Sequence, residues 1–161
     1  MTKYNFLKII IVFAAISLIA GCKEKPDIGY TSTYKMSGDW YIELRVDGTP
    51  VDAFTKVSTY NTSDPNSGQI WFDDLEYWPF KGKLDVDYAT LTFKPVAAVA
   101  DEYDDHITAR IVEGKILPNA SHSKTGSVVD SIFLKVEFSD DPGTEYEFSG
   151  HKRTGFFEDD Y

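Results

Sequence analysis

The stretch Gly38-Asp39-Trp40-Tyr41-Ile42-Glu43-Leu44-Arg45-Val46-Asp47-Gly48 decides the fold of this chain. From Trp40 to Asp47, apolar side chains occupy the even positions and polar side chains occupy most of the odd ones. A period of two is typical of a β-strand with one face in a core and the other in water. Asp47-Gly48 then carries the signal of a tight hairpin turn. The stretch therefore predicts an amphipathic strand that turns directly into a second one.

The same alternation continues along the chain, with short turns between the apolar runs. We expect further strands at residues 51–61, 69–75, 80–86, 89–96, 106–113, 128–139 and 144–152. The polar stretch 117–127 is expected to form a long loop. About eight short strands with little helix predict an all-β fold, either a sandwich or an antiparallel up-and-down barrel. Closing the sheet into a barrel removes its exposed edges and can leave room for one small ligand.

The N-terminal segment has the order of a secretory signal peptide. Two lysines lie in the first eight residues, and an apolar run follows from Ile9 to Ala20. Ile19-Ala20-Gly21-Cys22 then resembles a bacterial lipobox, in which the cysteine is acylated and becomes the mature N-terminus. We therefore expect a lipoprotein signal peptide over residues 1–21 and lipid on Cys22. A plain signal peptide followed by a chance cysteine, or an uncleaved anchor, are the alternatives.

Cleavage before Cys22 would leave 140 of the 161 residues, which is enough for one domain. We expect a tether over residues 22–37, a barrel over 38–156 and a frayed acidic tail over 157–161. Removing two of the 16 basic residues with the signal leaves 14 against 26 acidic ones, a formal charge of −12. Such a charge argues against nucleic acid as a partner, so membrane attachment is expected to come from the acylated cysteine. Because Cys22 is the single cysteine, its acylation would also exclude disulfides and thiol chemistry.

The start of the first strand resembles a known fold signature. Gly38-Asp39-Trp40-Tyr41 is similar to the Gly-x-Trp-Tyr start of the lipocalins, which are eight-stranded barrels that bind small apolar molecules. In that family the glycine allows a tight turn and the tryptophan plugs the closed end of the barrel. The resemblance implies that a basic residue from the end of the barrel lies over Trp40 in a cation–π contact. Arg153 is the candidate for that residue.

The arrangement of the whole chain resembles a more specific family. The lipobox is followed by a short tether, the Gly38–Tyr41 strand, the stretch Lys56–Thr62 and the C-terminal stretch Ser149–Phe156. This order is similar, over residues 36–158, to the small Gram-negative lipoproteins called lipid-binding putative hydrolases, which have a lipocalin-like fold of the calycin type. The resemblance implies a lipid-anchored protein of the outer membrane that binds a small hydrophobic or amphipathic molecule. It assigns no catalytic residues.

Hydrolase chemistry has one weak candidate pair in the sequence. The chain has no Gly-x-Ser-x-Gly elbow, but Ser149 and His151 lie two positions apart in a predicted strand and would point to the same face. Asp130 or Glu147 could serve as a third member. The favoured interpretation is that both are ordinary strand residues, so we expect no catalytic site.

Several apolar side chains are candidates to contact a ligand. Aromatic side chains at a barrel mouth can hold an apolar or sugar ligand by packing and stacking. The candidates are Trp71, Trp78 and Phe80 among the aromatic clusters, and Leu91, Phe93, Ile111 and Leu134 among the alternating inward positions. The same inward residues would equally fill a solid core, and the sequence leaves both possibilities open.

The run Asp101-Glu102-Tyr103-Asp104-Asp105-His106 is the densest cluster of potential metal ligands. It lacks the register and the terminal glutamate of an EF-hand loop, so we interpret it as a solvated hairpin tip and expect no metal or cofactor. Two other functions stay open beside lipid binding. The protein could be an accessory or adhesion lipoprotein that binds a protein or a glycan through its outer surface, or a hydrolase acting on a lipid or an ester.

Overall fold

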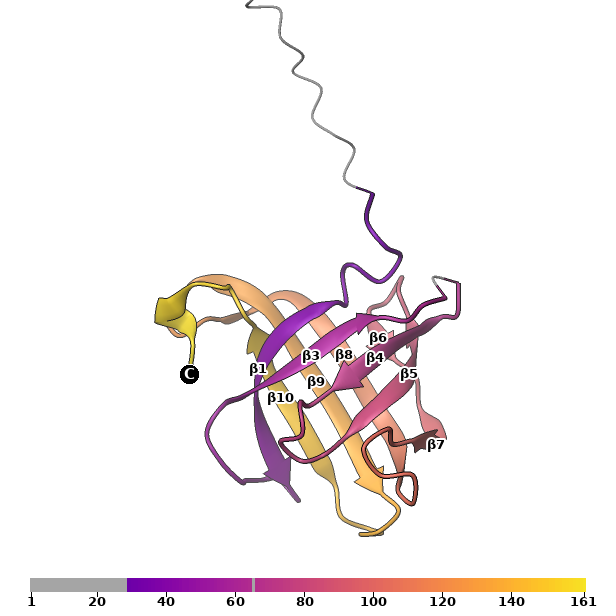
Figure 1. Cartoon of the computed structure of the whole chain (residues 1–161). Helices are drawn as coiled ribbons and strands as arrows, with labels where there is room; N and C mark the ends of the chain where they lie inside the picture. Colours follow the sequence, from indigo (N-terminus) through magenta and orange to yellow (C-terminus); the bar gives the residue numbers. More distant parts are fainter. Residues whose placement is uncertain (1–28, 65) are drawn as a thin grey trace, which may run out of the picture.

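The computed structural model describes residues 29–64 and 66–161, so the expected signal peptide and Cys22 lie outside the described residues (Figure 1). Within them the chain forms an antiparallel β-barrel, which confirms the predicted fold class. The strands are Gly38–Val46 (β1), Thr49–Pro50 (β2), Thr55–Asn61 (β3), Gln69–Asp73 (β4), Lys81–Asp87 (β5), Thr92–Phe93 (β6), Val96–Ala100 (β7), Thr108–His122 (β8), Val128–Phe138 (β9) and Tyr146–Lys152 (β10). A short 3-10 helix, Phe157–Asp159 (η1), follows them.

The sheet closes because β1 pairs with β3 on one side and with β10 on the other. The remaining strands follow in the order β3-β4-β5-β6-β8-β9-β10, while β7 also pairs with β8 and β2 extends β1. Eight strand positions therefore surround the core and leave no open edge at the seam between β1 and β10. At this seam Gly150 pairs with Ile42, and a Cβ on the glycine would collide with the carbonyl oxygen of Tyr41. A glycine is required there by the close approach of the two strands.

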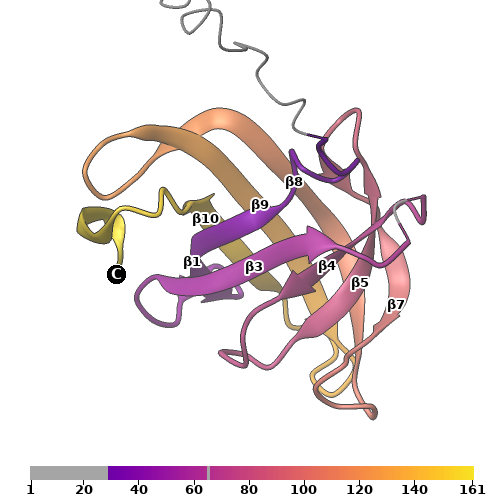
Figure 2. The same cartoon turned by 45° about the horizontal axis from the view of Figure 1, so that its top comes forward.

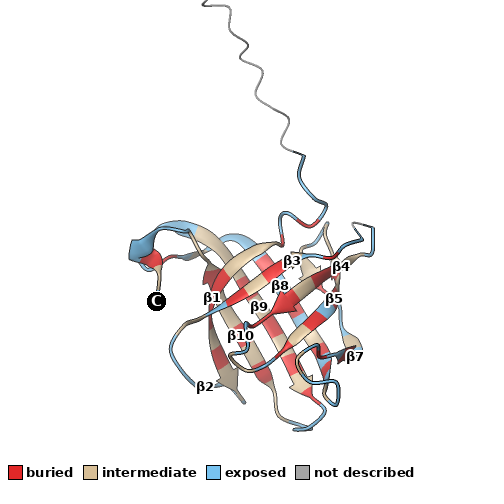
Figure 3. Cartoon of the chain, viewed as in Figure 1, coloured by how far each residue is buried: buried red, intermediate tan, exposed pale blue. Residues whose placement is uncertain are grey.

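Buried residues alternate with less buried ones along the strands of the barrel (Figure 3). On β1 the even positions Trp40, Ile42 and Leu44 are fully buried, as the period of two predicts. Aromatic rings then contact one another in series, with centroid distances of 5.3 Å for Phe148–Phe72, 5.8 Å for Phe72–Phe80 and 5.4 Å for Phe80–Phe138. The inward side chains therefore pack against one another as a core, and this line of rings runs through it.

The predicted loop over residues 117–127 is wrong. β8 continues to His122, and Leu117 and Ser121 pair with Ser131 and Val129 of β9, so only residues 123–127 turn. This part of the hairpin extends past the barrel (Figure 2) and has no core to face, so its side chains are mostly exposed. An alternation of apolar and polar residues arises only where one face of a strand is buried. The sequence signal for a strand is therefore missing exactly where the strand leaves the barrel.

Other predicted boundaries differ by a few residues. The predicted strand 89–96 begins with a turn through Leu91, whose φ of 56° is left-handed, and only then forms β6 and the start of β7. The predicted strand 51–61 begins at Thr55, because residues 51–54 cross from β2 to β3 as a loop. None of these differences changes the order of the strands around the barrel.

The closed end of the barrel contains Trp40, as the lipocalin resemblance implies, but the basic residue over it is not Arg153. The Nζ atom of Lys152 lies 5.5 Å from the centroid of the Trp40 ring, while Arg153 forms an ion pair with Asp160 at 2.7 Å. The indole N–H of Trp40 donates to the hydroxyl of Thr59 at 2.8 Å. Lys152 is the last residue of β10 and pairs with Trp40 across the seam, whereas Arg153 follows the strand and its side chain reaches Asp160 instead.

The end of the expected tether also packs on the barrel. Met36 is fully buried, Thr33 is nearly so, and the carbonyl of Met36 accepts a hydrogen bond from the Thr59 hydroxyl at 2.6 Å. The segment that precedes β1 therefore covers the closed end next to Trp40. This part of residues 22–37 is therefore packed on the barrel and does not act as a free tether.

The acidic tail is docked rather than frayed. The carboxylate of Asp159 is buried and accepts hydrogen bonds from the backbone of Thr125 (2.8 Å) and the hydroxyl of Thr154 (2.6 Å). Asp160 accepts hydrogen bonds from Arg153 and from the hydroxyl of Tyr41. The tail thus joins the β8–β9 turn to the outer face of β1 and β10. In residues 29–64 and 66–161, no helix has both the length and the apolar character needed to cross a bilayer.

Candidate functional site

Three loops meet at the end of the barrel opposite Trp40. They span residues 74–80 between β4 and β5, 101–107 between β7 and β8, and 139–145 between β9 and β10. The register of β1 and β10 places them there, because Trp40 pairs with Lys152 at one end of β1 while Val46 pairs with Tyr146 at the other. We call this end, at the bottom of Figure 1, the mouth of the barrel.

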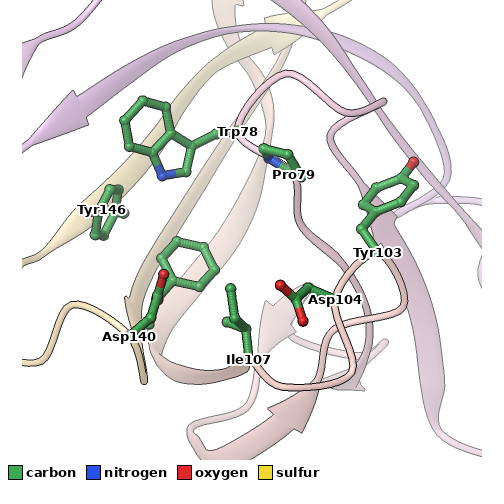
Figure 4. Close-up of a pocket in the computed structure, with 8 residues that line it drawn as sticks. Trp78, Pro79, Tyr103, Asp104, Ile107, Asp140 and Tyr146 are labelled. Carbon is green, nitrogen blue, oxygen red and sulfur yellow. The ribbon is translucent and has the colours of Figure 1, made fainter.

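A pocket of about 390 Å³ opens at the mouth (Figure 4). Its apolar lining comes from Trp78, Pro79, Ile107, Phe138 and Tyr146, and its remaining lining from Tyr103, Asp104 and Asp140. This volume lies at the lower end of the range found for small-molecule sites. We call it the mouth pocket.

Aromatic rings form one wall of the mouth pocket. The rings of Trp78 and Tyr146 lie 5.6 Å apart, and those of Tyr146 and Phe138 lie 5.0 Å apart edge to face. Phe138 in turn contacts Phe80, so the line of rings in the core ends at the pocket. Burial and the hydrogen bond to Asp141 raise the pKa of Tyr146 to about 12, so its hydroxyl stays protonated.

Asp74 fixes the loop that carries Trp78. Its fully buried carboxylate accepts hydrogen bonds from the backbone N–H groups of Glu76 (3.1 Å), Trp78 (2.9 Å) and Phe80 (3.1 Å). The loop begins with Leu75 and Glu76 in the left-handed region, with φ of 58° and 66°. Burial raises the pKa of Asp74 to about 6, although the three donated hydrogen bonds favour the charged form and oppose the shift.

Asp73, the preceding residue, holds the outer side of the mouth. Its carboxylate accepts hydrogen bonds from the hydroxyls of Tyr60 (2.8 Å) and Tyr103 (2.7 Å) and lies 3.2 Å from Nζ of Lys81. Burial alone would raise the pKa of Asp73, but hydrogen bonds led by that from Tyr103 outweigh it and lower this pKa. Burial and the same hydrogen bond raise the pKa of Tyr103. Tyr103 is therefore tied to the barrel wall through its hydroxyl, while its ring lines the pocket.

The structure brings only one of the seven predicted ligand residues to the mouth pocket. Trp78 lines it, whereas Phe80 is buried in the core just beneath. Trp71 lies on the outer face of β4, where Nζ of Lys83 is 4.7 Å from its ring centroid. The remaining four belong to the core or pack against it: Leu91, Phe93, Ile111 and Leu134. Their predicted role as ligand contacts stays a prediction.

Sequence reasoning missed most of the pocket lining. Tyr103 and Asp104 lie in the run that the sequence indicates to be a solvated hairpin tip, Asp140 lies in a turn, and Tyr146 begins a strand. A cluster of aromatic and acidic residues in loops at one end of a predicted barrel is the signal that could have identified them. The cluster is not visible in the sequence because its residues lie far apart along the chain. The alternation along one strand does not show which loops meet in space.

Ser149 and His151 line a second recess, also of about 390 Å³, on the outside of the barrel, together with Arg45 and Phe133. The imidazole of His151 is buried among the rings of Tyr41, Phe54 and Tyr161, at 5.3 Å from Phe54 and 5.7 Å from Tyr161.

The Nε2 atom of His151 has no hydrogen-bond partner within the described part of the chain, so Ser149 does not donate to it. Burial lowers the pKa of His151, against an opposing effect of the nearby Asp159 carboxylate. The recess brings the two predicted residues onto one face but does not couple them. Their catalytic role stays a prediction.

The acidic run at residues 101–106 divides into a buried start and an exposed tip. One carboxylate oxygen of Asp101 accepts the backbone N–H groups of Lys81 (3.1 Å) and Tyr103 (2.9 Å), so this residue orders the loop. Asp104, Asp105 and His106 are exposed and could offer ligand atoms within 4.8 Å of one another. Exposed acidic groups commonly lie this close without a metal, so this proximity by itself does not assign a metal site to the tip.

A family described as "lipid-binding putative hydrolase" matches residues 25–157. The matched region includes the segment before β1, every strand of the barrel and the mouth pocket. No curated protein matches the chain.

Proposed function

Because the chain belongs to the family of lipid-binding putative hydrolases, we propose that it binds a small hydrophobic or amphipathic, lipid-like ligand in the mouth pocket. The observation that carries the proposal is the aromatic wall of the pocket, in which Trp78 and Tyr146 lie 5.6 Å apart above the end of a closed core. Apolar ligand surface that packs against these rings is removed from water, which favours binding by about 25 cal/mol per Å². The cost of immobilising the ligand is subtracted from this gain. The inward side chains pack against one another as a core, and the mouth pocket offers about 390 Å³ at the end of that core.

Native mass spectrometry of the chain from residue 23 onward, with lipid extraction of the same sample, tests this proposal. We expect a co-purifying lipid-like molecule in a one-to-one complex, and we expect Trp78→Ala to reduce the occupied fraction. Trp71→Ala is the matched control, because Trp71 lies on the outer face of β4. An apo mass for the unaltered protein, together with no uptake of apolar dye at micromolar concentration, would overturn the proposal.

We also propose that the protein is a lipoprotein of the outer membrane. Ile19-Ala20-Gly21-Cys22 after an apolar run supports acylation of Cys22 and anchoring through the attached lipid. Metabolic labelling with radioactive palmitate should mark the wild-type protein, and Cys22→Ala should lose both the label and sedimentation with outer-membrane fractions. Labelling that persists in Cys22→Ala would contradict this assignment.

The outer surface supports a second candidate function, the binding of a glycan or a protein. Trp71 is half-buried on β4, and the Nζ atoms of Lys83 and Lys81 lie 4.7 Å and 5.6 Å from its ring centroid. An exposed aromatic face between cations is suited to stacking on a sugar ring or on a partner side chain. If this surface carries the function, Trp71→Ala will abolish partner binding and leave dye uptake unchanged, whereas Trp78→Ala will do the reverse.

A further inference from the structure

The chemistry of the mouth pocket also specifies the head group of its ligand. We propose that the pocket selects amphiphiles with a cationic alkylammonium head over those with an anionic head. This inference rests on the proposed function, since it concerns the same pocket. Three features of the described residues support it. They are the aromatic rings that line the pocket, the hydrogen bonds that the tyrosine hydroxyls already make, and the acidic residues at the rim of the pocket.

The first feature is the set of rings. Trp78, Tyr146, Phe138 and Tyr103 all line the pocket, and the first three contact one another at 5.0 and 5.6 Å. In Figure 4, Trp78 and Tyr146 lie on one side of the pocket and Tyr103 lies on the other. The faces of aromatic rings carry negative potential, so a group of rings around one space attracts a cation, best of all an alkylated ammonium.

The second feature is that the tyrosine hydroxyls are already engaged. Tyr146 donates its hydroxyl to Asp141 at 2.7 Å, and Tyr103 donates its hydroxyl to Asp73 at 2.7 Å. Those hydroxyl hydrogens are therefore not available to an anionic head group. What the two residues offer the pocket is their rings.

The third feature is the charge of the rim. Asp104 and Asp140 line the pocket, and its eight lining residues include neither lysine nor arginine. Lys81, at the start of β5, lies on the outer side and is paired with Asp73 at 3.2 Å. The chain as a whole carries a formal charge of −10. An anionic head in the pocket would meet two carboxylates without a counter-charge, whereas a cationic head would be attracted by both.

Binding of three amphiphiles with the same decyl chain tests the proposal. Isothermal titration calorimetry of the chain lacking residues 1–22 would use decyltrimethylammonium, decyl maltoside and decyl sulfate, each below its micellar concentration. Two exposed carboxylates and one cation–π contact predict that the ammonium binds at least about tenfold more tightly than the sulfate at low salt. This preference should shrink as the salt concentration rises.

Charge-neutralising variants locate the effect. The double variant Asp104→Asn/Asp140→Asn should weaken ammonium binding and bring the ammonium-to-sulfate ratio close to one. Glu113→Gln/Glu158→Gln removes the same charge from exposed positions outside the pocket and should keep the wild-type ratio. An equal loss of preference in both double variants would assign the effect to net charge and overturn the proposal.

The remaining outcomes separate the head-group inference from the proposed function. If all three amphiphiles bind with equal affinity, or if decyl sulfate binds most tightly, the inference is overturned and the lipid-binding function stands. If none of them binds the unaltered protein, the inference and the proposed function fail together.

Discussion

Asp74 is the residue on which the shape of the mouth depends. Its buried carboxylate receives three backbone N–H groups from a loop that starts with two left-handed residues. Because the loop carries Trp78 and Pro79, the position of the aromatic wall follows from this one side chain. A buried polar group is tolerated when it is hydrogen-bonded, and it becomes costly once a partner is removed.

We expect Asp74→Ala to lower the free energy of unfolding by about 2–4 kcal/mol, because it leaves three backbone donors without an acceptor near the core. Urea denaturation followed by circular dichroism measures the loss. Asp105→Ala is the matched control, since Asp105 lies at an exposed hairpin tip, and its effect should stay within about 0.5 kcal/mol. Equal stability of the two variants would contradict the role given to Asp74.

The pKa of Asp74 gives a prediction about pH. The folded protein holds this proton with a pKa of about 6, against 3.8 in the unfolded chain. Between pH 4 and 6 the folded state therefore binds more protons at this site, so this contribution to stability decreases as the pH rises and is lost above pH 6. Asp74→Asn should remove that slope from the pH profile of the unfolding free energy. A carboxyl titration of Asp74 below pH 4, measured by NMR, would show that the hydrogen bonds outweigh burial.

His151 gives a dependence of the opposite sign. Burial lowers its pKa below 6.5, so its contribution to stability is complete above pH 6.5 and is lost as the pH falls toward the folded-state pKa. His151→Phe keeps a ring among Tyr41, Phe54 and Tyr161 and removes the titrating group. Between pH 7.5 and 5.5, chemical denaturation should show a smaller loss of stability for this variant than for the wild type. Identical profiles would contradict the assignment.

At the scale of elements, the C-terminal segment acts as a strap across the outer face. η1 and the residues after it contact the β8–β9 turn through Thr125 and Lys124 and contact β1 through Tyr41. These contacts join the outer face of β1 to the tip of the β8–β9 hairpin, which extends past the barrel. The strap therefore supports the part of the sheet that has no core of its own.

Deleting residues 157–161 should destabilise the protein by about 1–3 kcal/mol, because it removes a buried carboxylate network and uncovers Tyr41, Phe54 and His151. Hydrogen exchange should rise in particular at residues 123–127, which lose the acceptor of the Thr125 amide. Phe157→Ser is the control for the exposed surface of this segment, since its side chain contributes little to the packing. A truncated protein with unchanged exchange in the turn would contradict the strap.

At the scale of the whole molecule, the barrel is a closed sheet around a packed core, and the mouth pocket lies where the loops of one end meet. Phe72 lies in the line of rings, in contact with Phe80 and Phe148, and is fully buried. Phe72 does not line the mouth pocket, whereas Phe138 and Tyr146 belong both to the core and to the pocket. A change at Phe72 therefore tests the stability of the barrel without altering the lining of the pocket.

Phe72→Ala should cost about 3–5 kcal/mol of unfolding free energy, as other large-to-small replacements of a buried ring do. Phe157→Ala removes the same atoms from a side chain that is 90% exposed and should cost less than about 0.5 kcal/mol. Thermal unfolding of the two variants beside the wild type measures both. A small effect of Phe72→Ala would indicate that the barrel has more empty space than the ring contacts imply.

The sequence by itself determined the class of fold, most of the strands and the core positions Trp40, Ile42 and Leu44 of β1. Local alternation is sufficient for this, because each strand has one face against the core and the period of two records that face residue by residue. Residues 117–122 are the exception that follows from the same cause, since a strand beyond the barrel has no buried face.

Only the tertiary structure decided which residues form the mouth pocket, which cation lies over Trp40, and that the tail is docked. These features depend on the register between β1 and β10 and on which loops meet at one end of the barrel. Contacts of this kind join residues far apart in the sequence, such as Tyr41 with Asp160 or Tyr103 with Asp73. The periodicity along one strand does not predict such contacts, because they depend on how the closed sheet brings its loops together in space.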